Sequence, residues 1–228
     1  MKLFFAAFLL FSCSLLAYSQ QDLTGAYGYS LKPTGNTGND KQATGPAGKL
    51  VLLKMEENKY RFWLDVTIGW PSYNVGETDG TISFVNDTAS FDNTFEDAGN
   101  PCILKFKRTG TTISINSQSS SFNCGFGNQV HADGEFTKLK VQPVLDNKWL
   151  KTEYPQAPLA TVTANRAEIF QDENCLVPFL PKKYFTKGDS FLNIAETQKS
   201  MYLEDIPAPG KFTWGWIRKS DVKMASLK

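Results

Sequence analysis

Residues 119–136, SSSFNCGFGNQVHADGEF, gather residue types that could do chemistry: Cys124, several glycines and His131, the only histidine of the chain. A cysteine nucleophile needs a base within hydrogen-bond reach, usually a histidine. His131 is the one candidate, but no third group that could orient it is evident nearby. We therefore expect no catalytic Cys–His pair here.

The same stretch does not fit a phosphate or metal site. The sequence GFG lacks the strand-to-helix context and the spacing of a nucleotide-binding loop. Cys124 and His131 offer two ligands, whereas zinc usually takes three or four from the protein. We expect no catalytic residue, no metal and no cofactor.

A disulfide explains Cys124 better. Cys102 in PCILKFK and Cys124 in SFNCGF flank a hairpin through Gly110. A bridge between them would close a loop of about 23 residues and stabilise the fold by roughly 3 kcal/mol. We expect this bridge at a corner of a β-barrel, with Cys175 left as a free thiol.

The chain begins with features of a secretory signal at residues 1–19. Lys2 precedes an apolar run over residues 3–16, and Ala17 and Ser19 suit cleavage before Gln20. The run is too short to span a bilayer. We expect a secreted, periplasmic protein without a transmembrane anchor. The alternative is a lipoprotein, because LFSC resembles a lipobox that would attach lipid to Cys13.

The net charge and the expected export limit the classes of partner. The formal charge is +1 and there is no arginine-rich stretch, so nucleic acid is not an expected ligand. Export favours disulfides, in line with the predicted bridge. The sequence does not indicate an oligomeric state.

Strand patterns dominate residues 20–140. Large apolar residues alternate with others over much of KYRFWLDVTI (59–68), which is typical of a half-buried strand. Similar runs end in Gly, Asn, Asp or Ser, as hairpins require. We expect seven or eight antiparallel strands between Leu23 and Leu139, forming a barrel or a sandwich. Residues 32–48 are rich in Gly, Thr, Asn and Pro and predict a mobile loop, either solvated or binding.

The composition changes after this domain. Residues 141–159 contain three prolines and few strand signals, which predicts a loosely packed linker anchored by Trp149. Few buried contacts should then cross the linker. A second β-rich unit follows over residues 160–224, so the overall fold class is all-β.

The second unit resembles bacterial SH3-like domains. The resemblance rests on ANRAEIFQDENC (164–175), PKKYFTKGDSFLNIAE (181–196) and WGWIRKSDV (214–222). It implies a small barrel that binds a peptide or a cell-wall fragment. The segment ETQKSMYLEDIPAPGKFTWGW departs from the family pattern, because a loop with two prolines stands where the family has a short hairpin. The N-terminal half is weakly similar to small exported β-barrel domains, some of which accompany lysozyme-inhibitor-like proteins.

We expect a non-catalytic binding protein that recognises a peptide, a protein or a peptidoglycan fragment. Aromatic side chains supply contact area at low entropic cost. The candidates in the C-terminal unit are Tyr184, Tyr202, Trp214 and Trp216. Trp214 and Trp216 share a strand face, so they should be buried or exposed together, and filling the core is the alternative role.

Two other function classes stay open. In an inhibitor of a secreted hydrolase such as lysozyme, residues 32–48 or an edge formed by Trp70 and Tyr73 would enter the target's cleft; equally, Trp70 could fold over the barrel mouth. In a cell-envelope enzyme, Cys175 or scattered carboxylates would act. The enzyme hypothesis is disfavoured because the sequence has no histidine near Cys175 and no pattern for the helices of a mixed α/β catalytic domain.

Overall fold

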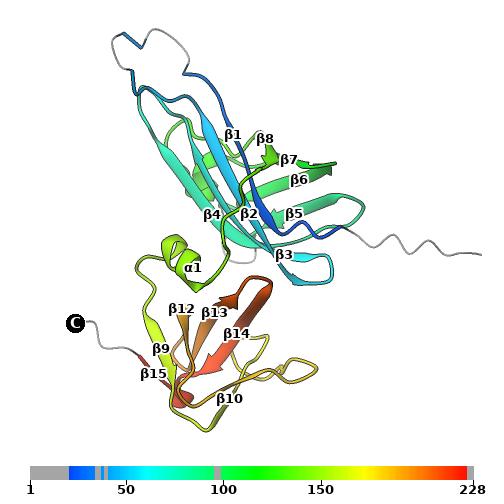
Figure 1. Cartoon of the computed structure of the whole chain (residues 1–228), viewed down its shortest axis with the longest axis vertical. Helices are drawn as coiled ribbons and strands as arrows, with labels where there is room; N and C mark the ends of the chain where they lie inside the picture. Colours follow the sequence, from blue (N-terminus) through cyan, green and yellow to red (C-terminus); the bar gives the residue numbers. More distant parts are fainter. Residues whose placement is uncertain (1–20, 34–36, 39–40, 95–98, 225–228) are drawn as a thin grey trace, which may run out of the picture.

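The computed structural model describes residues 21–33, 37–38, 41–94 and 99–224. The described chain is mostly strand, and the predicted all-β class is confirmed. A large sheet and a smaller unit lie one above the other, with a short helix between them (Figure 1). The expected signal at residues 1–19, with Cys13, lies outside the described residues, as do parts of the 32–48 loop.

Residues 25–138 form one eight-stranded antiparallel sheet that nearly closes into a barrel. Its order is β4-β3-β2-β1-β8-β7-β6-β5, so consecutive strands pair and β1 meets β8. The strands are β1 (Gly25–Ser30), β2 (Ala47–Glu56), β3 (Lys59–Thr67), β4 (Val75–Ser83), β5 (Thr88–Asp92), β6 (Ile103–Thr109), β7 (Thr112–Ser117) and β8 (Gly134–Lys138).

The remaining gap lies between β4 and β5. A tight turn joins them, with Val85 and Thr88 exchanging backbone hydrogen bonds, but no ladder continues from it. The Phe91 ring fills the gap and packs against Phe62, with ring centroids 5.1 Å apart. Gly80 has no room for a Cβ because the edge of the Phe91 ring lies there.

Strand β3 shows where the alternation of apolar and polar residues predicts burial correctly and where it does not. Tyr60, Phe62 and Leu64 point into the barrel and are buried, as the period of two predicts. Arg61 and Trp63 belong to the outer face, yet they are also buried. The C-terminal unit covers that face of the barrel.

The linker prediction is wrong in one respect, because residues 141–159 are not loosely packed. They contain helix α1 (Asn147–Glu153), whose N-terminus is capped by the Asp146 carboxylate accepting the Trp149 N–H at 2.9 Å. Leu150 is fully buried. The helix belongs to a cluster of buried apolar residues from both halves: Ala26, Val51, Leu53, Trp63, Leu145, Leu150, Leu192 and Ile206.

The expectation of few buried contacts between the halves is therefore also wrong. We call this contact region the junction, and it comprises the apolar cluster just described. Its barrel side is made by outward-facing residues of β2 and β3, among them Val51, Leu53 and Trp63.

The C-terminal unit has a five-stranded antiparallel sheet of order β14-β13-β12-β9-β15 and a two-stranded sheet, β10-β11. The strands are β9 (Leu159–Val162), β10 (Arg166–Glu168), β11 (Tyr184–Thr186), β12 (Ser190–Glu196), β13 (Ser200–Ala208), β14 (Lys211–Arg218) and β15 (Val222–Met224). The described residues also form two short 3-10 helices, η1 (Ser121–Cys124) in the barrel and η2 (Lys219–Asp221) here. One face of the larger sheet packs on its own core, which includes Phe191, Leu203 and Ile217.

Candidate ligand-binding groove

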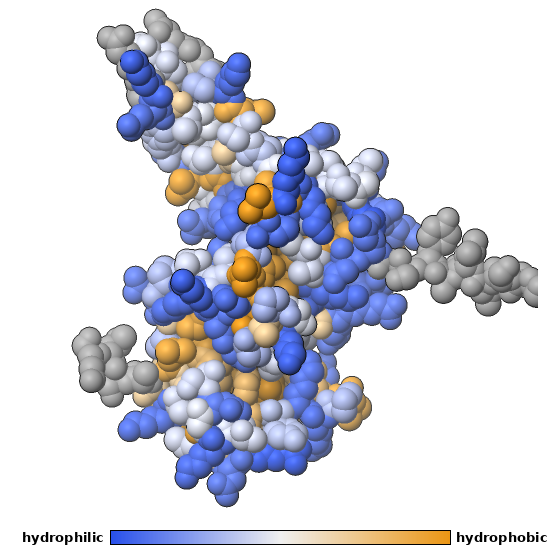
Figure 2. All heavy atoms as spheres, in the orientation of Figure 1, coloured by the Kyte–Doolittle hydropathy of each residue, from blue (hydrophilic) through white to orange (hydrophobic). Residues whose placement is uncertain are grey.

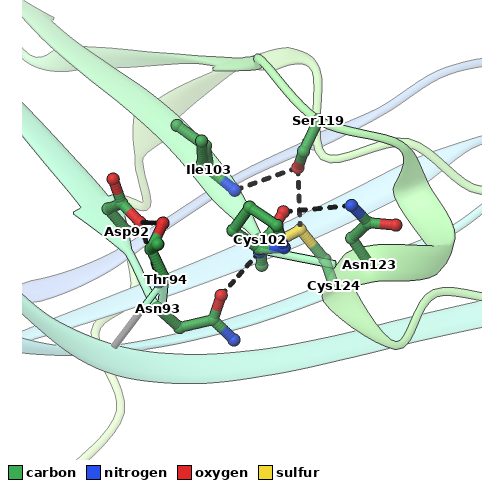
Figure 3. The surroundings of a disulfide bond; sticks show 9 residues. Asp92, Asn93, Thr94, Cys102, Ile103, Ser119, Asn123 and Cys124 are labelled. Atoms are coloured by element: carbon green, nitrogen blue, oxygen red, sulfur yellow. Dashed lines mark hydrogen bonds between the residues drawn. A yellow bond between two sulfur atoms is a disulfide. The ribbon is translucent and has the colours of Figure 1, made fainter. Parts of the chain in front are cut away.

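The predicted Cys102–Cys124 disulfide is confirmed (Figure 3), with Cα atoms 4.7 Å apart. Polar contacts hold the chain around it: Cys102 N–H donates to Asn93 Oδ1 at 2.6 Å, and Ile103 N–H donates to Ser119 Oγ at 2.9 Å. The sulfur of Cys124 is engaged in this bridge. Residues 119–136 thus form a stapled corner of the barrel.

Trp214 does not line an open groove, contrary to its proposed role. It is 6% exposed and packs edge-on against Phe179, with ring centroids 4.9 Å apart. The Lys59 Nζ, from the start of β3, lies 4.9 Å from the Trp214 ring centroid. The barrel therefore covers this tryptophan.

Trp216 is half-buried and stacks at a tilt on Tyr202, with centroids 5.4 Å apart. The expectation that Trp214 and Trp216 share one environment is therefore wrong. The two rings do stand on the same strand face, but Trp214 lies under Lys59 of the barrel, whereas Trp216 stacks on Tyr202.

The other predicted aromatics lie elsewhere. Tyr184 is half exposed on the small sheet, with the Arg166 guanidinium 3.9 Å from its ring centroid. Trp70 and Tyr73 belong to the β3–β4 loop, at the barrel end away from the β2–β3 turn. There the Trp70 N–H donates to Thr44 O at 2.7 Å, and Tyr73 is 44% exposed. The six aromatics do not form one site.

Strand register places three cross-strand pairs in a row on the face of the larger sheet that looks away from its core. Directly opposed residues of an antiparallel pair lie on the same face. The pairs, in order along β13, are Ser200 with Arg218, Tyr202 with Trp216, and Glu204 with Trp214. The row leads from an open groove at one end to the junction at the other.

A buried ion pair lies at the junction end of the row. Arg61 Nε donates to Glu204 Oε1 at 2.7 Å, and Arg61 also binds Asp79 and the Tyr154 hydroxyl. Glu204 is fully buried and its Oε2 has no hydrogen-bond partner. Burial raises the pKa of Glu204 to about 7, outweighing the attraction of Arg61. This cluster joins the two halves, with the Asp79 side chain at its partly exposed edge.

A cavity of about 790 Å³ lies at the other end of the row. We call it the basic groove. Residues from three segments line it: Glu173, Asn174, Cys175, Leu176, Thr197, Gln198, Lys199, Ser200, Arg218, Lys219 and Ser220.

Three cations line the basic groove. Lys219 Nζ pairs with Glu196 at 3.0 Å, and the Arg218 guanidinium lies 4.4 Å from the Phe170 ring centroid while donating to the Cys175 carbonyl at 3.2 Å. Lys199 has no acidic partner within the part of the chain that the structure describes. An anionic group of a ligand would therefore find an unpaired ammonium.

Hydrogen bonds fix the conformation of the 172–177 loop, which forms one wall of the basic groove. Asp172 Oδ1 accepts the N–H groups of Leu176 at 3.0 Å and Val177 at 2.6 Å, and these bonds lower the pKa of Asp172. Ser200 Oγ donates to the Glu173 carbonyl at 2.6 Å. Leu176 is 77% exposed, so the wall presents an apolar side chain on an ordered loop.

Cys175, the free thiol, belongs to this loop with its side chain buried, and burial raises its pKa. A raised pKa lowers the thiolate fraction and hence the reactivity. The groove is therefore better suited to binding than to thiol chemistry.

The sequence analysis named Cys175 and the segment ETQKSMYLEDIPAPGKFTWGW, but it did not identify Lys199, Arg218 or Leu176 as site residues. Their positions, 176, 199 and 218, are far apart in the chain, so only the fold brings them together. Unlike the tryptophans, they carry no motif that marks them as a set.

Within the described ranges, no group of three or more His, Cys, Asp or Glu residues could hold a metal ion, and no helix is long and apolar enough to cross a membrane. No protein-family model, curated protein or solved structure matches the chain.

Proposed function

We propose that the protein is an exported, non-catalytic binding protein. Its C-terminal unit, which resembles bacterial SH3-like domains, holds a peptide or a cell-wall fragment. The ligand lies in the basic groove and presents a carboxylate to Lys199 and an apolar group to Leu176. The observation that carries this proposal is the unpaired Lys199 ammonium in a cavity of about 790 Å³ with an ordered, apolar-rimmed wall.

The groove has the physical features of a binding site. It combines a large concave volume with a few charged groups at fixed positions, which give orientation and specificity. Preorganisation of the 172–177 loop by Asp172 lowers the entropic cost of binding. Half-buried Trp216 and Tyr202 continue the same face and could contact a longer ligand.

The test is titration calorimetry with soluble muropeptides that carry free carboxylates, alongside the same peptides amidated. We expect binding of the acid form to be lost in Lys199→Glu and kept in Lys187→Glu, a matched reversal at an exposed lysine in the β11–β12 turn. Equal affinity of both variants, or no preference for the carboxylate, would contradict the proposal.

Export has its own test. Intact-mass measurement of the protein recovered from the cell envelope should show a chain that starts at Gln20. A diacylglycerol adduct on Cys13 would instead establish the lipoprotein. The observed disulfide supports export, because such bonds persist in oxidising compartments.

Inhibition of a secreted hydrolase is the second candidate, and one observation favours it. The two segments expected to enter a target's cleft meet at one barrel end, where the Trp70 N–H binds Thr44 O at 2.7 Å. Tyr73 and Leu31 are exposed there, at 44% and 59%. A lysozyme activity assay with wild type and Tyr73→Ala tests it: inhibition that Tyr73→Ala abolishes would support this function over the first.

A further inference from the structure

The segment between β10 and β11 carries three large apolar side chains that the fold leaves in solvent. Leu176, Val177 and Leu180 are 77%, 50% and 88% exposed. We call these three residues the apolar patch. Their segment lies at the surface of the C-terminal unit (Figure 1), which shows apolar areas bordered by hydrophilic side chains (Figure 2). Single exposed apolar residues are common, but several in one short segment mark a surface that contacts a protein or a membrane.

The fold holds the apolar patch in one conformation. Phe179, between Val177 and Leu180, is buried and packs edge-on against Trp214. The Gln171 N–H donates to Val177 O at 2.8 Å, in addition to the bonds that Asp172 makes in the same loop. Because the segment is ordered before any partner arrives, contact through the patch costs little conformational entropy.

Cations stand on both sides of the apolar patch. One group lines the basic groove together with Leu176, and the other follows Leu180 in the chain or lies on the neighbouring strand β10. These cations are Lys199, Arg218, Lys219, Lys182, Lys183 and Arg166.

Most of these cations have no carboxylate partner. Lys182 pairs with Glu168, and Lys219 pairs with Glu196. Among the residues that the structure describes, no carboxylate lies within ion-pair distance of the other four cations. The Asp172 carboxylate accepts backbone N–H groups of its own loop, and Glu173 is the one acidic residue in the lining of the basic groove. The region therefore has a surplus of positive charge, which complements an anionic surface.

The combination of side chains favours a lipid surface over a protein surface. Tyr184 on β11 is half exposed, with the Arg166 guanidinium 3.9 Å from its ring centroid, and Lys183 Nζ lies 4.3 Å from the ring centroid of Phe179. The core of a protein interface is poor in lysine. At a membrane surface, in contrast, apolar side chains enter the acyl region while tyrosine rings and cations stay among the headgroups.

We propose that this part of the C-terminal unit docks on an anionic lipid membrane. The apolar patch enters the boundary between the headgroups and the acyl chains, and Lys183, Lys199 and Arg218 lie among the anionic headgroups. Apolar burial and electrostatic attraction both contribute to such binding. The contact is peripheral and reversible, because three side chains bury little surface compared with a membrane-spanning helix.

This inference goes beyond the carboxylate ligand proposed above and does not require it. Leu180 is the most exposed residue of the apolar patch and is not part of the lining of the basic groove. A variant at Leu180 therefore alters the membrane contact and leaves muropeptide binding intact.

The test is flotation with lipid vesicles, using the exported chain that starts at Gln20, because the apolar run over residues 3–16 would itself bind lipid. We expect binding to vesicles of phosphatidylcholine and phosphatidylglycerol in equal parts, and weaker binding to phosphatidylcholine alone. Leu180→Ser should weaken binding about tenfold, since one leucine no longer enters the acyl region. Val85→Ser, at a 64% exposed position in the β4–β5 turn of the barrel, is the matched control. No binding to the anionic vesicles, no preference for them, or equal binding of the two variants would overturn the proposal.

A fluorophore locates the contact. The environment-sensitive dye NBD, attached to Leu180→Cys, should gain emission when anionic vesicles are added, and the same dye on Val85→Cys should not. The dye reacts with the new cysteine only, because the native cysteines are bridged or buried. An equal gain at both positions, or no gain at position 180, would contradict insertion of the apolar patch.

Two further measurements separate this proposal from its alternatives. A dimer that Leu180→Ser dissociates in sedimentation experiments, without vesicle binding, would assign the apolar patch to a second copy of the chain and overturn the membrane contact. Muropeptide titration distinguishes the two proposals. Binding of muropeptides without binding of vesicles would reject the membrane contact alone, and vesicle binding without muropeptide binding would support it and reject the carboxylate ligand.

Discussion

Arg61 and Glu204 form a buried ion pair across the junction, with Arg61 Nε 2.7 Å from Glu204 Oε1. Arg61 lies on the outer face of β3 in the barrel, and Glu204 lies on β13 of the C-terminal unit. The pair links the two halves, because removing either buried partner leaves the other without its main charge partner.

Arg61→Met should destabilise the protein by about 3–5 kcal/mol at neutral pH, because it removes one partner of a buried ion pair and Glu204 must then take up a proton to remain buried. Urea unfolding measures the change. The double variant Arg61→Met/Glu204→Leu, which removes both charges, should recover most of the loss. An equal loss in both variants would mean that packing, not charge, dominates this contact.

Stability should fall as pH rises from about 4.5 to 7. The folded-state pKa of Glu204 is raised from 4.5 to about 7, so the native state holds a proton that the unfolded state has released. The slope from this group is at most about 1.4 kcal/mol per pH unit. Asp65, whose pKa burial and then Glu153 raise to about 6, adds to the same trend. Glu204→Gln should flatten the profile of unfolding free energy against pH, and an unchanged profile would exclude Glu204 as the source.

Trp214→Ala should cost about 3–5 kcal/mol, as expected for a large aromatic removed from a buried site. Trp216→Ala should cost less, because that side chain is half-buried. Thermal melts of both variants provide the comparison, and the order of the two melting temperatures is the critical result. A lower melting temperature for Trp216→Ala would place the main support of the sheet face at the Tyr202 pair.

Loss of the Cys102–Cys124 bridge should cost about 3 kcal/mol in the chain-entropy model, in which the constraint acts on the unfolded chain. The variant Cys102→Ser/Cys124→Ser measures this by urea unfolding. In the intact protein a thiol reagent should label Cys175 only after unfolding, because that residue is 4% exposed. Rapid labelling under native conditions would show that the 172–177 loop opens.

The barrel was predictable because its inner face follows a simple rule. Tyr60, Phe62 and Leu64 alternate with other residues, and the strands that carry such patterns are consecutive in both sequence and sheet. The disulfide followed from cysteines flanking a hairpin. Local signals of this kind need no knowledge of distant partners.

The junction was not predictable by the same means. Alternation assigns Arg61 to solvent, and its partner Glu204 is 143 positions away. Helix α1 is too short to show a clear period, and its cap Asp146 stands among prolines and strand-poor sequence. The basic groove has the same difficulty, since Lys199 and Arg218 approach only once β13 and β14 have paired.

The covering of Trp214 by Lys59 limits how far the two halves are modular. Excision of residues 160–224 would uncover Trp214 and leave Glu204 without Arg61, while the barrel alone would expose Val51, Leu53 and Trp63. The C-terminal unit is thus not an independent module that can be transferred to another protein on its own. A chimera that transplants its ligand specificity must carry the β2–β3 hairpin as well, or redesign the surface that the hairpin shields.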